Sequence, residues 1–344
     1  MTPAADLQAH FLDQARACAS LGSPFMERLL SLLARRMAPG NAVTDRLFAW
    51  EPRNLRSDAV ALRLAGGLHA LVLTGADARL AALYPPSRAD EDTLWEAVQA
   101  ALSSQADTLL HWLDNAPQTN EPRRATALIV AAGQIARHFP GIDLRLSELG
   151  ASAGLNLQFD SFGLIAGAKR VGPEHPVLTL RPDWSGPLPA GGAYRIAGRG
   201  GADVNPLDRA NRADMLRLRS YIWPDQPDRM ERLDAILSLP APSVDREDAG
   251  SWLARRLANR PAGQVDLVYH TIAWQYFPTA TAAACQAALA SAALRATDDM
   301  PLAWLSFEMD DKSPGAPVRL RLWPGAYDIP LGRMDFHGRW FQAC

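Results

Sequence analysis

Apolar residues recur at helical intervals through the first 139 residues of the chain. Leu7, Phe11 and Ala15 are spaced four apart, so they would line one face of an α-helix. Ser23-Pro24 is typical of an N-cap residue followed by proline at the first helical position. The pattern predicts helices over residues 6–19, 25–37, 57–74, 92–113 and 121–138.

The periodicity changes after Pro140-Gly141, where short runs typical of strands begin. Residues 142–147 alternate apolar and polar side chains and lead into a glycine-rich turn, and residues 265–270 form a run typical of a buried strand. Further strands are expected over 177–181, 194–197, 242–244, 301–309, 318–323 and 331–341. Further helices are expected over 211–239, with an interruption at Trp223-Pro224, and over 250–259 and 279–297.

This alternation of strands and helices predicts an α/β fold with a doubly wound, mostly parallel sheet whose last strand is antiparallel. We expect residues 1–119 to form a helical amino-terminal region and residues 120–344 to form the domain that contains the sheet. In an enzyme with this organisation, the helical region would supply a lid and the substrate side of the site.

The composition narrows the class of partner. The 344 residues are 48% hydrophobic and 21% charged, which is typical of a soluble globular protein, and the net charge is −2. Because basic residues occur no more than two in a row, we expect neither a nucleic-acid surface nor a membrane surface. The first residues lack a secretory signal pattern, and Cys18, Cys285 and Cys344 lack metal-binding spacing, so a cytoplasmic protein with reduced thiols is expected.

Residues 148–154 read ELGASAG, and this stretch fits two different kinds of site. In one interpretation, Gly-x-Ser-x-Gly is a nucleophile elbow, which would make Ser152 the nucleophile of a hydrolase. Such an enzyme also needs an acid and a histidine later in the chain, and Asp266 and His337 come in a suitable order. However, it also needs several strands and an oxyanion loop before the elbow, and the pattern predicts mostly helices there.

In the other interpretation, the stretch is the turn after a first strand, built to approach a nucleotide. Gly150 and Gly154 allow a tight turn and a close approach, and Glu148 at the strand end could accept a hydrogen bond from a ligand. The spacing resembles the first motif of the Rossmann-like methyltransferases that bind S-adenosylmethionine. The resemblance implies that the methionine and ribose portion of this cofactor contacts Glu148, Gly150, Ala151, Ser152, Gly154 and Asn156.

The same resemblance extends to later stretches. Residues 265–270 resemble the fourth strand of those methyltransferases, residues 301–309 the fifth, and the last two predicted strands the sixth and the reversed seventh. Asp248-Ala249 resembles the turn that contacts adenine. The second strand of the family ends in an acid that binds the ribose. Here residues 194–197 run into Gly198-Arg199-Gly200-Gly201, so Asp203 is the ribose ligand, or Asp183 is, or neither is.

Several side chains are candidates for contact with the substrate. His270 ends the fourth strand and is either a general base or a core histidine. Glu121, the second catalytic candidate, and Arg123 lie on the first turn of a helix, where they would contact a polar substrate group or stabilise the helix dipole. Asn120 is an N-cap or a substrate contact, and Trp274 and Tyr276 would wall the pocket.

A metal site is not expected from the sequence. Glu308 and Asp310-Asp311 follow a predicted strand, but no third ligand stands at useful spacing, so an exposed acidic turn is the preferred interpretation. The histidines form no H-x-x-x-H or H-E-x-x-H pair either.

Several stretches together resemble the uncharacterised bacterial family known as domain of unknown function 2332. They are LGSP at 21–24, QTNE at 118–121, ELGASAGLN at 148–156, D-x-N-P-x-D at 203–208, WPDQ at 223–226 and YH-x-x-x-WQY at 269–276. The resemblance covers nearly the whole chain and implies no particular activity.

The resulting hypothesis is an S-adenosylmethionine-dependent methyltransferase that acts on a small molecule. Two alternatives are a non-catalytic module of the same fold that binds a nucleotide or S-adenosylmethionine, and a serine hydrolase that uses Ser152.

Overall fold

The computed structural model describes residues 3–189 and 191–344. The chain divides into two compact units: residues 1–119 with 210–231, and residues 120–209 with 232–344. The sequence predicts a single division, after residue 119. The structure also assigns residues 210–231 to the first unit.

The first unit consists of helices. Its elements are α1 (Pro3–Ser20), α2 (Pro24–Arg36), α3 (Ala42–Phe48), η1 (Pro52–Asn54), α4 (Val60–Thr74), α5 (Ala78–Ala81), α6 (Glu91–Ser104), α7 (Ala106–Asp114), α9 (Arg212–Ser220) and the first part of α10 (Pro227–Leu237). One helix had been predicted over 92–113, and the structure has two, α6 and α7, which meet at Gln105.

Two of the singled-out sequence stretches meet inside this unit. Ser23 caps α2, because its Oγ accepts a hydrogen bond from the Met26 amide (3.2 Å), and the same hydroxyl donates to Asp225 Oδ1 (2.5 Å). The Phe25 amide donates to Asp225 Oδ2 (2.8 Å), and Trp223 belongs to the apolar core of the unit. The stretches LGSP and WPDQ therefore hold the returning segment 210–231 in place.

The second unit contains two sheets. Its elements are η2 (Pro122–Arg124), α8 (Ala125–His138), β1 (Asp143–Leu149), η3 (Asn156–Ser161), β2 (Phe162–Ala166), β3 (Lys169–Val171), β4 (Leu178–Leu180), β5 (Asp183–Ser185), β6 (Ile196–Asp203), the end of α10, β7 (Val244–Arg246), α11 (Ala249–Ala258), β8 (Gln264–Thr271), η4 (Trp274–Tyr276), α12 (Thr279–Leu294), β9 (Leu302–Phe307), β10 (Ala316–Trp323), β11 (Tyr327–Met334) and β12 (Trp340–Ala343).

The large sheet has nine strands in the order β5-β12-β11-β10-β9-β8-β1-β6-β7. The strands from β7 to β9 are parallel to one another, and along the sheet the chain order reverses between β1 and β8. Ligands of open α/β sheets bind beyond the carboxyl ends of the strands at such a reversal. The expected α/β class with a mostly parallel sheet is therefore present. The topology indicates the carboxyl ends of β1 and β8 as the expected position of a ligand site.

The other half of the sheet differs from the expected pair of final strands. β10 is antiparallel to β9, β11 to β10 and β12 to β11, so three reversed pairings follow one another along the chain. The region predicted as one strand over 331–341 is divided between β11 and β12 by a turn around Asp335. A single antiparallel last strand was therefore too simple a prediction.

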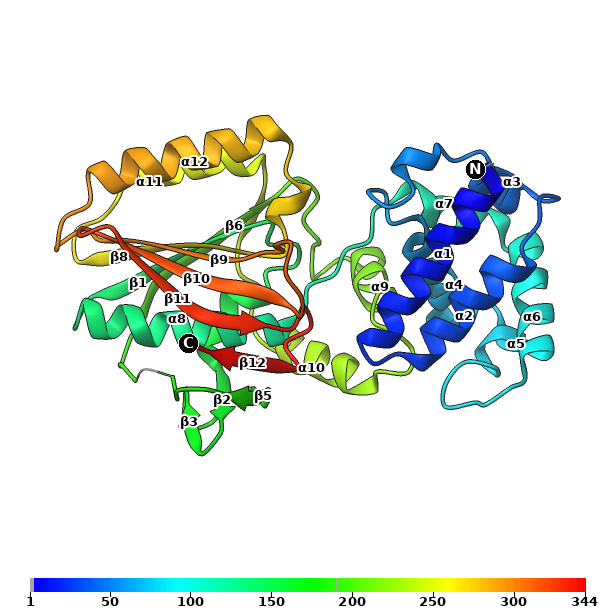
Figure 1. Cartoon of the computed structure of the whole chain (residues 1–344), viewed down its shortest axis with the longest axis horizontal. Helices are drawn as coiled ribbons and strands as arrows, with labels where there is room; N and C mark the ends of the chain where they lie inside the picture. Colours follow the sequence, from blue (N-terminus) through cyan, green and yellow to red (C-terminus); the bar gives the residue numbers. More distant parts are fainter. Residues whose placement is uncertain (1–2, 190) are drawn as a thin grey trace. The chain divides into compact units, whose positions relative to one another are not determined.

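Helices lie on both faces of the large sheet. α11 and α12 lie on one face, and α8 lies on the other (Figure 1). The core under α11 and α12 contains Trp252, Val268 and Leu289. In the described part of the connection from β1 to β6 there is no α-helix, and η3 with the small sheet β3-β2-β4 takes its place.

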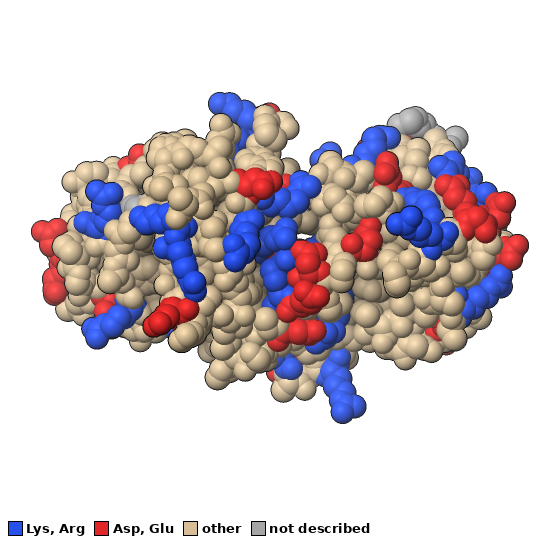
Figure 2. All heavy atoms as spheres, turned by 90° about the horizontal axis from the view of Figure 1, so that it is seen from below, with Lys and Arg blue, Asp and Glu red and all other residues tan. Residues whose placement is uncertain are grey.

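The surface carries charges of both signs. Acidic and basic side chains are interspersed on each unit over the face shown in Figure 2. Within residues 3–189 and 191–344, no helix combines the length and the apolar character needed to span a bilayer.

Candidate functional site

The turn after β1 is fixed by hydrogen bonds to the neighbouring strand β6. The amides of Gly150 and Ala151 both donate to the Ala202 carbonyl oxygen, at 2.9 and 3.1 Å. Gly150, Ser152 and Gly154 have φ values of +72°, +52° and +66°, so the backbone enters the left-handed region three times in five residues. The expected strand followed by a glycine turn is present, and β6 supports it.

The two glycines of this turn are also required by packing. A Cβ atom on Gly150 would lie 2.7 Å from the Ala273 Cβ, and one on Gly154 would lie 2.8 Å from the Pro242 Cγ. Since both glycines also have positive φ, any other residue would clash and be strained. Their contacts within the protein explain both glycines without a ligand.

Asp203 is the last residue of β6, which corrects the sequence analysis. A strand is predicted only over residues 194–197, but the glycine-rich stretch 198–201 also belongs to β6. The Asp203 carboxylate accepts hydrogen bonds from the Ser152 amide on Oδ2 and from the Asn205 amide on Oδ1, both at 2.8 Å. An acid therefore stands at the carboxyl end of the second parallel strand. Asp183, the other candidate, lies in β5 at the far edge of the sheet.

Four polar side chains beside this turn carry buried atoms without hydrogen-bond partners among the described residues. We call them the unpaired cluster, and the atoms are Glu148 Oε2, Asn156 Oδ1, Arg209 Nη1 and Nη2, and the Tyr269 hydroxyl. Glu148 and Asn156 are 2% exposed and Tyr269 is 0% exposed. A buried polar atom without a partner costs about 1–3 kcal/mol, so such a concentration indicates a place that is completed by water or by a ligand.

Backbone register brings the cluster together. Glu148 in β1 pairs with Tyr269 in β8, at the two central strands. Arg209 is held against the turn because its Nε donates to the Ala153 carbonyl oxygen (3.0 Å). Asn156 Nδ2 lies 3.4 Å from Asn120 Oδ1, and Asn120 Nδ2 donates to the Ala151 carbonyl oxygen (2.6 Å).

The electrostatics of the cluster are those of opposite charges that do not neutralise each other fully. Burial, and secondarily the negative charge of Asp203, raise the pKa of Glu148 well above the usual glutamate value. Burial lowers the pKa of Arg209 to about 10, against the opposing effect of Glu148. Burial also raises the pKa of Tyr269, and the charge of Glu148 adds to this. A ligand with both a cationic and an anionic group would suit these side chains.

A second group of polar side chains surrounds His270, also at the carboxyl ends of the parallel strands. The Trp304 indole N–H donates to His270 Nε2 (3.0 Å), and His270 Nδ1 lies 2.7 Å from Glu308 Oε1. Because an indole can only donate, Nε2 must accept and Nδ1 carries the proton that is donated to Glu308. Neither ring nitrogen is then available to take a proton from a substrate, so this geometry does not support His270 as a general base.

The two predicted aromatic residues are placed differently from each other. The Trp274 ring lies 4.6 Å from the His270 ring and 5.4 Å from the Phe277 ring, centroid to centroid. Tyr276 is 70% exposed. Trp274 is therefore part of the aromatic group around His270, and Tyr276 is on the surface.

Glu121, and not Asn120, is the N-cap residue of the segment before α8. Glu121 caps the η2 turn, since its Oε1 accepts from the Arg123 amide (3.1 Å), and it is 1% exposed. The alternative of Asn120 as an N-cap is therefore wrong, and Asn120 contacts the glycine turn instead. Arg123 is half-buried and packs near Gly338.

Asp248 has a structural contact on each of its two carboxylate oxygens. Oδ1 caps α11 by accepting from the amides of Gly250 and Ser251 (2.9 and 3.2 Å), and Oδ2 accepts from the Thr281 hydroxyl. Ala249 is buried in the first turn of α11. The predicted adenine contact stays a prediction.

Asp266 and Ser152, two of the three residues named for a hydrolase, lie at opposite ends of the central strands. Asp266, the proposed acid, lies near the amino end of β8 and forms ion pairs with Arg145 (2.9 Å) and Arg260 (2.8 Å). It is separated from Thr271 by five residues of strand, about 16 Å, whereas Ser152 follows the carboxyl end of β1. The His337 amide donates to Asp335.

Sequence reasoning missed three side chains at this edge. Arg209 is a single arginine in a loop, and Tyr269 is one polar residue within a buried run. The signal for Tyr269 was its hydroxyl in an otherwise apolar strand, whereas no local pattern marks Arg209. Glu308 was considered only as a metal ligand. Within the described residues, no group of three or more His, Cys, Asp or Glu could hold a metal ion.

Comparison with known proteins identifies the family alone. A family model described as "Uncharacterized protein conserved in bacteria (DUF2332)" matches residues 8–343. Since this covers nearly the whole chain, the chain belongs to this family. Neither a curated protein nor a solved structure matches it.

Proposed function

We propose that this member of the family is an S-adenosylmethionine-dependent methyltransferase that acts on a small molecule. The observation that carries the proposal is the unpaired cluster, which lies at the carboxyl ends of β1 and β8 and beside the turn that follows β1. Its polar atoms are buried and include an acidic group, on Glu148, and a basic group, on Arg209. Strand register and a hydrogen bond to the turn fix these side chains in position, as expected of a preformed ligand site.

The topology around the cluster supports a nucleotide-type ligand. The strand order reverses between β1 and β8, and in open α/β sheets a ligand crevice at such a reversal would lie beside Glu148 and Tyr269. Asp203 ends the adjacent strand β6, where an acid can accept hydrogen bonds from ribose hydroxyl groups. Each of its oxygens already accepts one amide and retains a second lone pair.

The buried charges support one orientation of the proposed cofactor. Arg209 presents two buried Nη atoms, and a planar guanidinium suits a carboxylate, such as that of the methionine portion. Glu148, with the Tyr269 hydroxyl beside it, suits the ammonium group of the same portion. Methyl transfer itself requires an aligned nucleophile more than a strong base, so orientation supplies much of the catalysis.

Calorimetry with the full chain tests the proposal. We expect S-adenosylmethionine and S-adenosylhomocysteine to bind saturably, and 5′-methylthioadenosine, which lacks the amino-acid portion, to bind more weakly. If neither S-adenosylmethionine nor S-adenosylhomocysteine binds at millimolar concentration, the proposal is wrong. Equal affinity for all three ligands would leave a nucleoside site without the assigned roles of Arg209 and Glu148.

A further inference from the structure

Glu308 follows the carboxyl end of β9 and has no role in the cofactor assignment above. His270 pairs with Ser306 across the β8/β9 ladder, so Ser306 and Glu308 point to the same side as His270. Glu148 is aligned with Tyr269 and, through it, with Leu305. Two strand spacings of about 4.8 Å and three residues of about 3.3 Å separate the Cα atoms of Glu148 and Glu308 by roughly 14 Å. Glu148 and Glu308 therefore belong to two separate acidic sites at the carboxyl ends of the strands.

Three donors fix one oxygen of the Glu308 carboxylate. Oε1 accepts from His270 Nδ1 (2.7 Å), from the Ala273 amide (3.0 Å) and from the Trp274 amide (3.2 Å). Oε2 is buried, and across residues 3–189 and 191–344 it has no hydrogen-bond partner. The side chain is thus immobilised through one oxygen, while the other keeps its full capacity to accept.

The chain of hydrogen bonds from Trp304 through His270 explains the orientation of Glu308. Trp304 donates to His270 Nε2, which forces the proton onto Nδ1 and hence towards Glu308. His270 is therefore a positioning residue, and the group left to act is Glu308 Oε2. The indole of Trp274 lies against His270, so an aromatic surface stands next to the carboxylate. A carboxylate beside an aromatic ring is a favourable environment for an organic cation.

We propose that Glu308 Oε2 binds the amino group of the substrate, so that the methyl acceptor is an amine. This inference rests on the proposed function for its chemistry. The bound ammonium group first gives one proton to Glu308 Oε2, which passes it to water. The resulting neutral amine would then attack the methyl carbon of the cofactor, so that an N–C bond forms and the C–S bond breaks with its electron pair left on sulfur. The nitrogen then gives one proton to the Glu308 carboxylate, which releases it to water.

Binding of n-butylammonium to the full chain tests the subsite without knowledge of the substrate. We expect saturable binding, followed by tryptophan fluorescence because Trp274 and Trp304 flank the site, and at least about tenfold weaker binding by Glu308→Gln. The amide oxygen of Glu308→Gln can still accept the three donors, so the variant should fold. Glu174→Gln, at an exposed glutamate, is the matched control and should bind like the wild type.

His270 variants separate a positioning role from a purely structural one. His270→Asn keeps a donor towards Glu308 and should retain most of the n-butylammonium affinity, whereas His270→Phe should lose it. Equal affinity of wild type and Glu308→Gln, or no saturable binding to folded wild type, would overturn the inference. Binding of S-adenosylhomocysteine, measured on the same samples, shows whether the proposed function fails with it or stands without it.

Discussion

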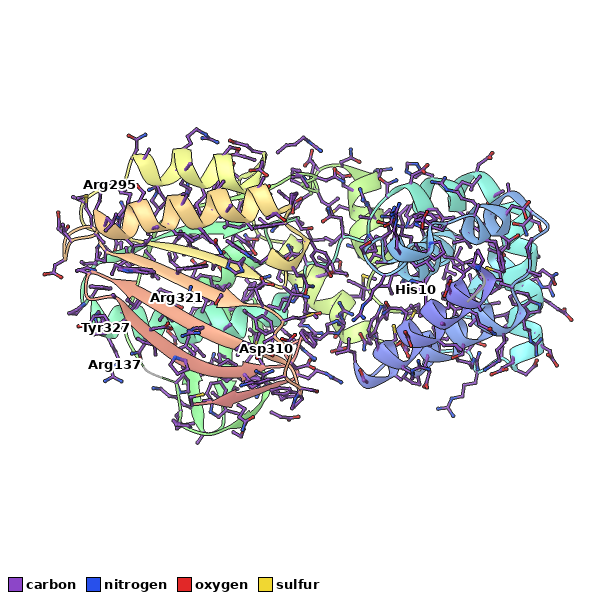
Figure 3. The ribbon with its side chains drawn as sticks, turned by 45° about the horizontal axis from the view of Figure 1, so that its top comes forward. His10, Arg137, Arg295, Asp310, Arg321 and Tyr327 are labelled. Carbon is purple, nitrogen blue, oxygen red and sulfur yellow. The ribbon has the colours of Figure 1, made fainter. Side chains whose placement is uncertain are left out.

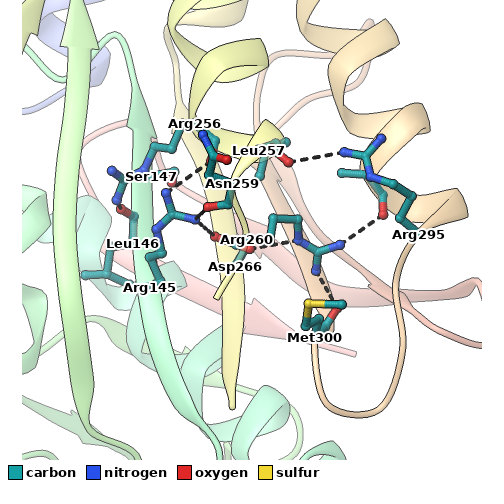
Figure 4. Close-up of polar contacts among 11 residues, drawn as sticks. Arg145, Leu146, Ser147, Arg256, Leu257, Asn259, Arg260, Asp266, Arg295 and Met300 are labelled. Carbon is teal, nitrogen blue, oxygen red and sulfur yellow. Dashed lines mark hydrogen bonds and ion pairs between the residues drawn. The ribbon is translucent and has the colours of Figure 1, made fainter. Parts of the chain in front are cut away.

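The two ends of the central strands β1 and β8 differ in how completely their buried polar groups are paired. At the amino ends, Asp266 is fully buried and is paired with both Arg145 and Arg260 (Figure 4). At the carboxyl ends, Glu148 and Tyr269 are equally buried and keep atoms without partners among the described residues. The same pair of strands therefore has one saturated end and one unsaturated end.

Arg256 in α11, which contacts the middle of β1, and Arg260 also satisfy backbone carbonyl groups. Arg256 donates to Ser147 Oγ and to the Leu146 carbonyl oxygen in β1, and Arg260 donates to the carbonyl oxygens of Ala292 and Met300. These bonds fasten α11, α12 and the following turn to the strands (Figure 4). The charges at this end therefore serve the fold.

The contrast shows which buried charges are candidates for function. A buried charge with complete contacts contributes to one fixed structure, whereas a buried charge with free atoms is ready to accept a ligand. In Figure 3, Arg295 after α12 and Asp310 after β9 mark the two opposite ends of the sheet. The proposed subsites all lie at the end marked by Asp310.

The largest effect is expected from breaking the saturated end. Asp266→Asn leaves Arg145 and Arg260 without their buried counter-charge, and removal of one partner of a buried pair costs about 3–5 kcal/mol of unfolding free energy. Denaturant unfolding would measure this loss. Asp143→Asn, which removes an exposed ion pair between the first residue of the neighbouring strand β1 and Arg195, should cost less than about 1 kcal/mol. Similar losses in both variants would contradict the comparison.

A change at the unsaturated end should affect binding instead. Arg209→Met removes the guanidinium assigned to the methionine carboxylate, and loss of a charge-assisted contact of about 1.5–3 kcal/mol predicts roughly ten- to hundredfold weaker binding of S-adenosylhomocysteine. Affinity for 5′-methylthioadenosine should not change. Arg195→Met, at an exposed position, is the control. Equal weakening of both ligands by Arg209→Met would mean that the side chain only supports the turn.

The raised pKa of Glu148 predicts an effect on stability that depends on pH. Because the folded state holds the proton more tightly than the unfolded state, stability falls as pH rises from the ordinary value of 4.5 through the folded pKa. The slope is at most about 1.4 kcal/mol per pH unit. Glu148→Gln lacks this titration, so it should be increasingly stable relative to wild type as pH rises. Parallel stability curves, from thermal unfolding between pH 4 and 9, would contradict the burial of an unneutralised carboxyl.

Local signals were sufficient to predict the strand and turn at 142–154. Alternating side chains and closely spaced glycines act within a few residues, so the sequence alone places β1, Glu148 and the turn. Asp203 at the end of β6 was not predicted as part of a strand, because the glycines before it suggest a loop. The structure gives the reason for these glycines: a Cβ on Gly201 would lie 2.5 Å from the Ala151 Cβ.

Side chains that act through long-range contacts could not be predicted. Arg209 reaches the Ala153 carbonyl oxygen across 56 residues of sequence. His270 was identified at the right strand end, but its role depends on Trp304 and Glu308, which come from the next strand in the sheet. The position of a polar residue at a strand end is thus readable from sequence, whereas the completeness of its hydrogen bonds is not.

The smallest effect is expected from Ser152→Ala. The printed sequence makes Ser152 the most conspicuous residue of the turn, but two of its contacts use the backbone: its amide donates to Asp203, and its carbonyl oxygen accepts from the Leu207 amide. Alanine keeps both, so affinity for S-adenosylhomocysteine should change less than about twofold and stability by less than about 1 kcal/mol. Fluorophosphonate labelling of the wild type that disappears in Ser152→Ala would instead favour the hydrolase. The nucleophile would then be Ser152, after the end of β1, and the side chains of the unpaired cluster would have no part in the reaction.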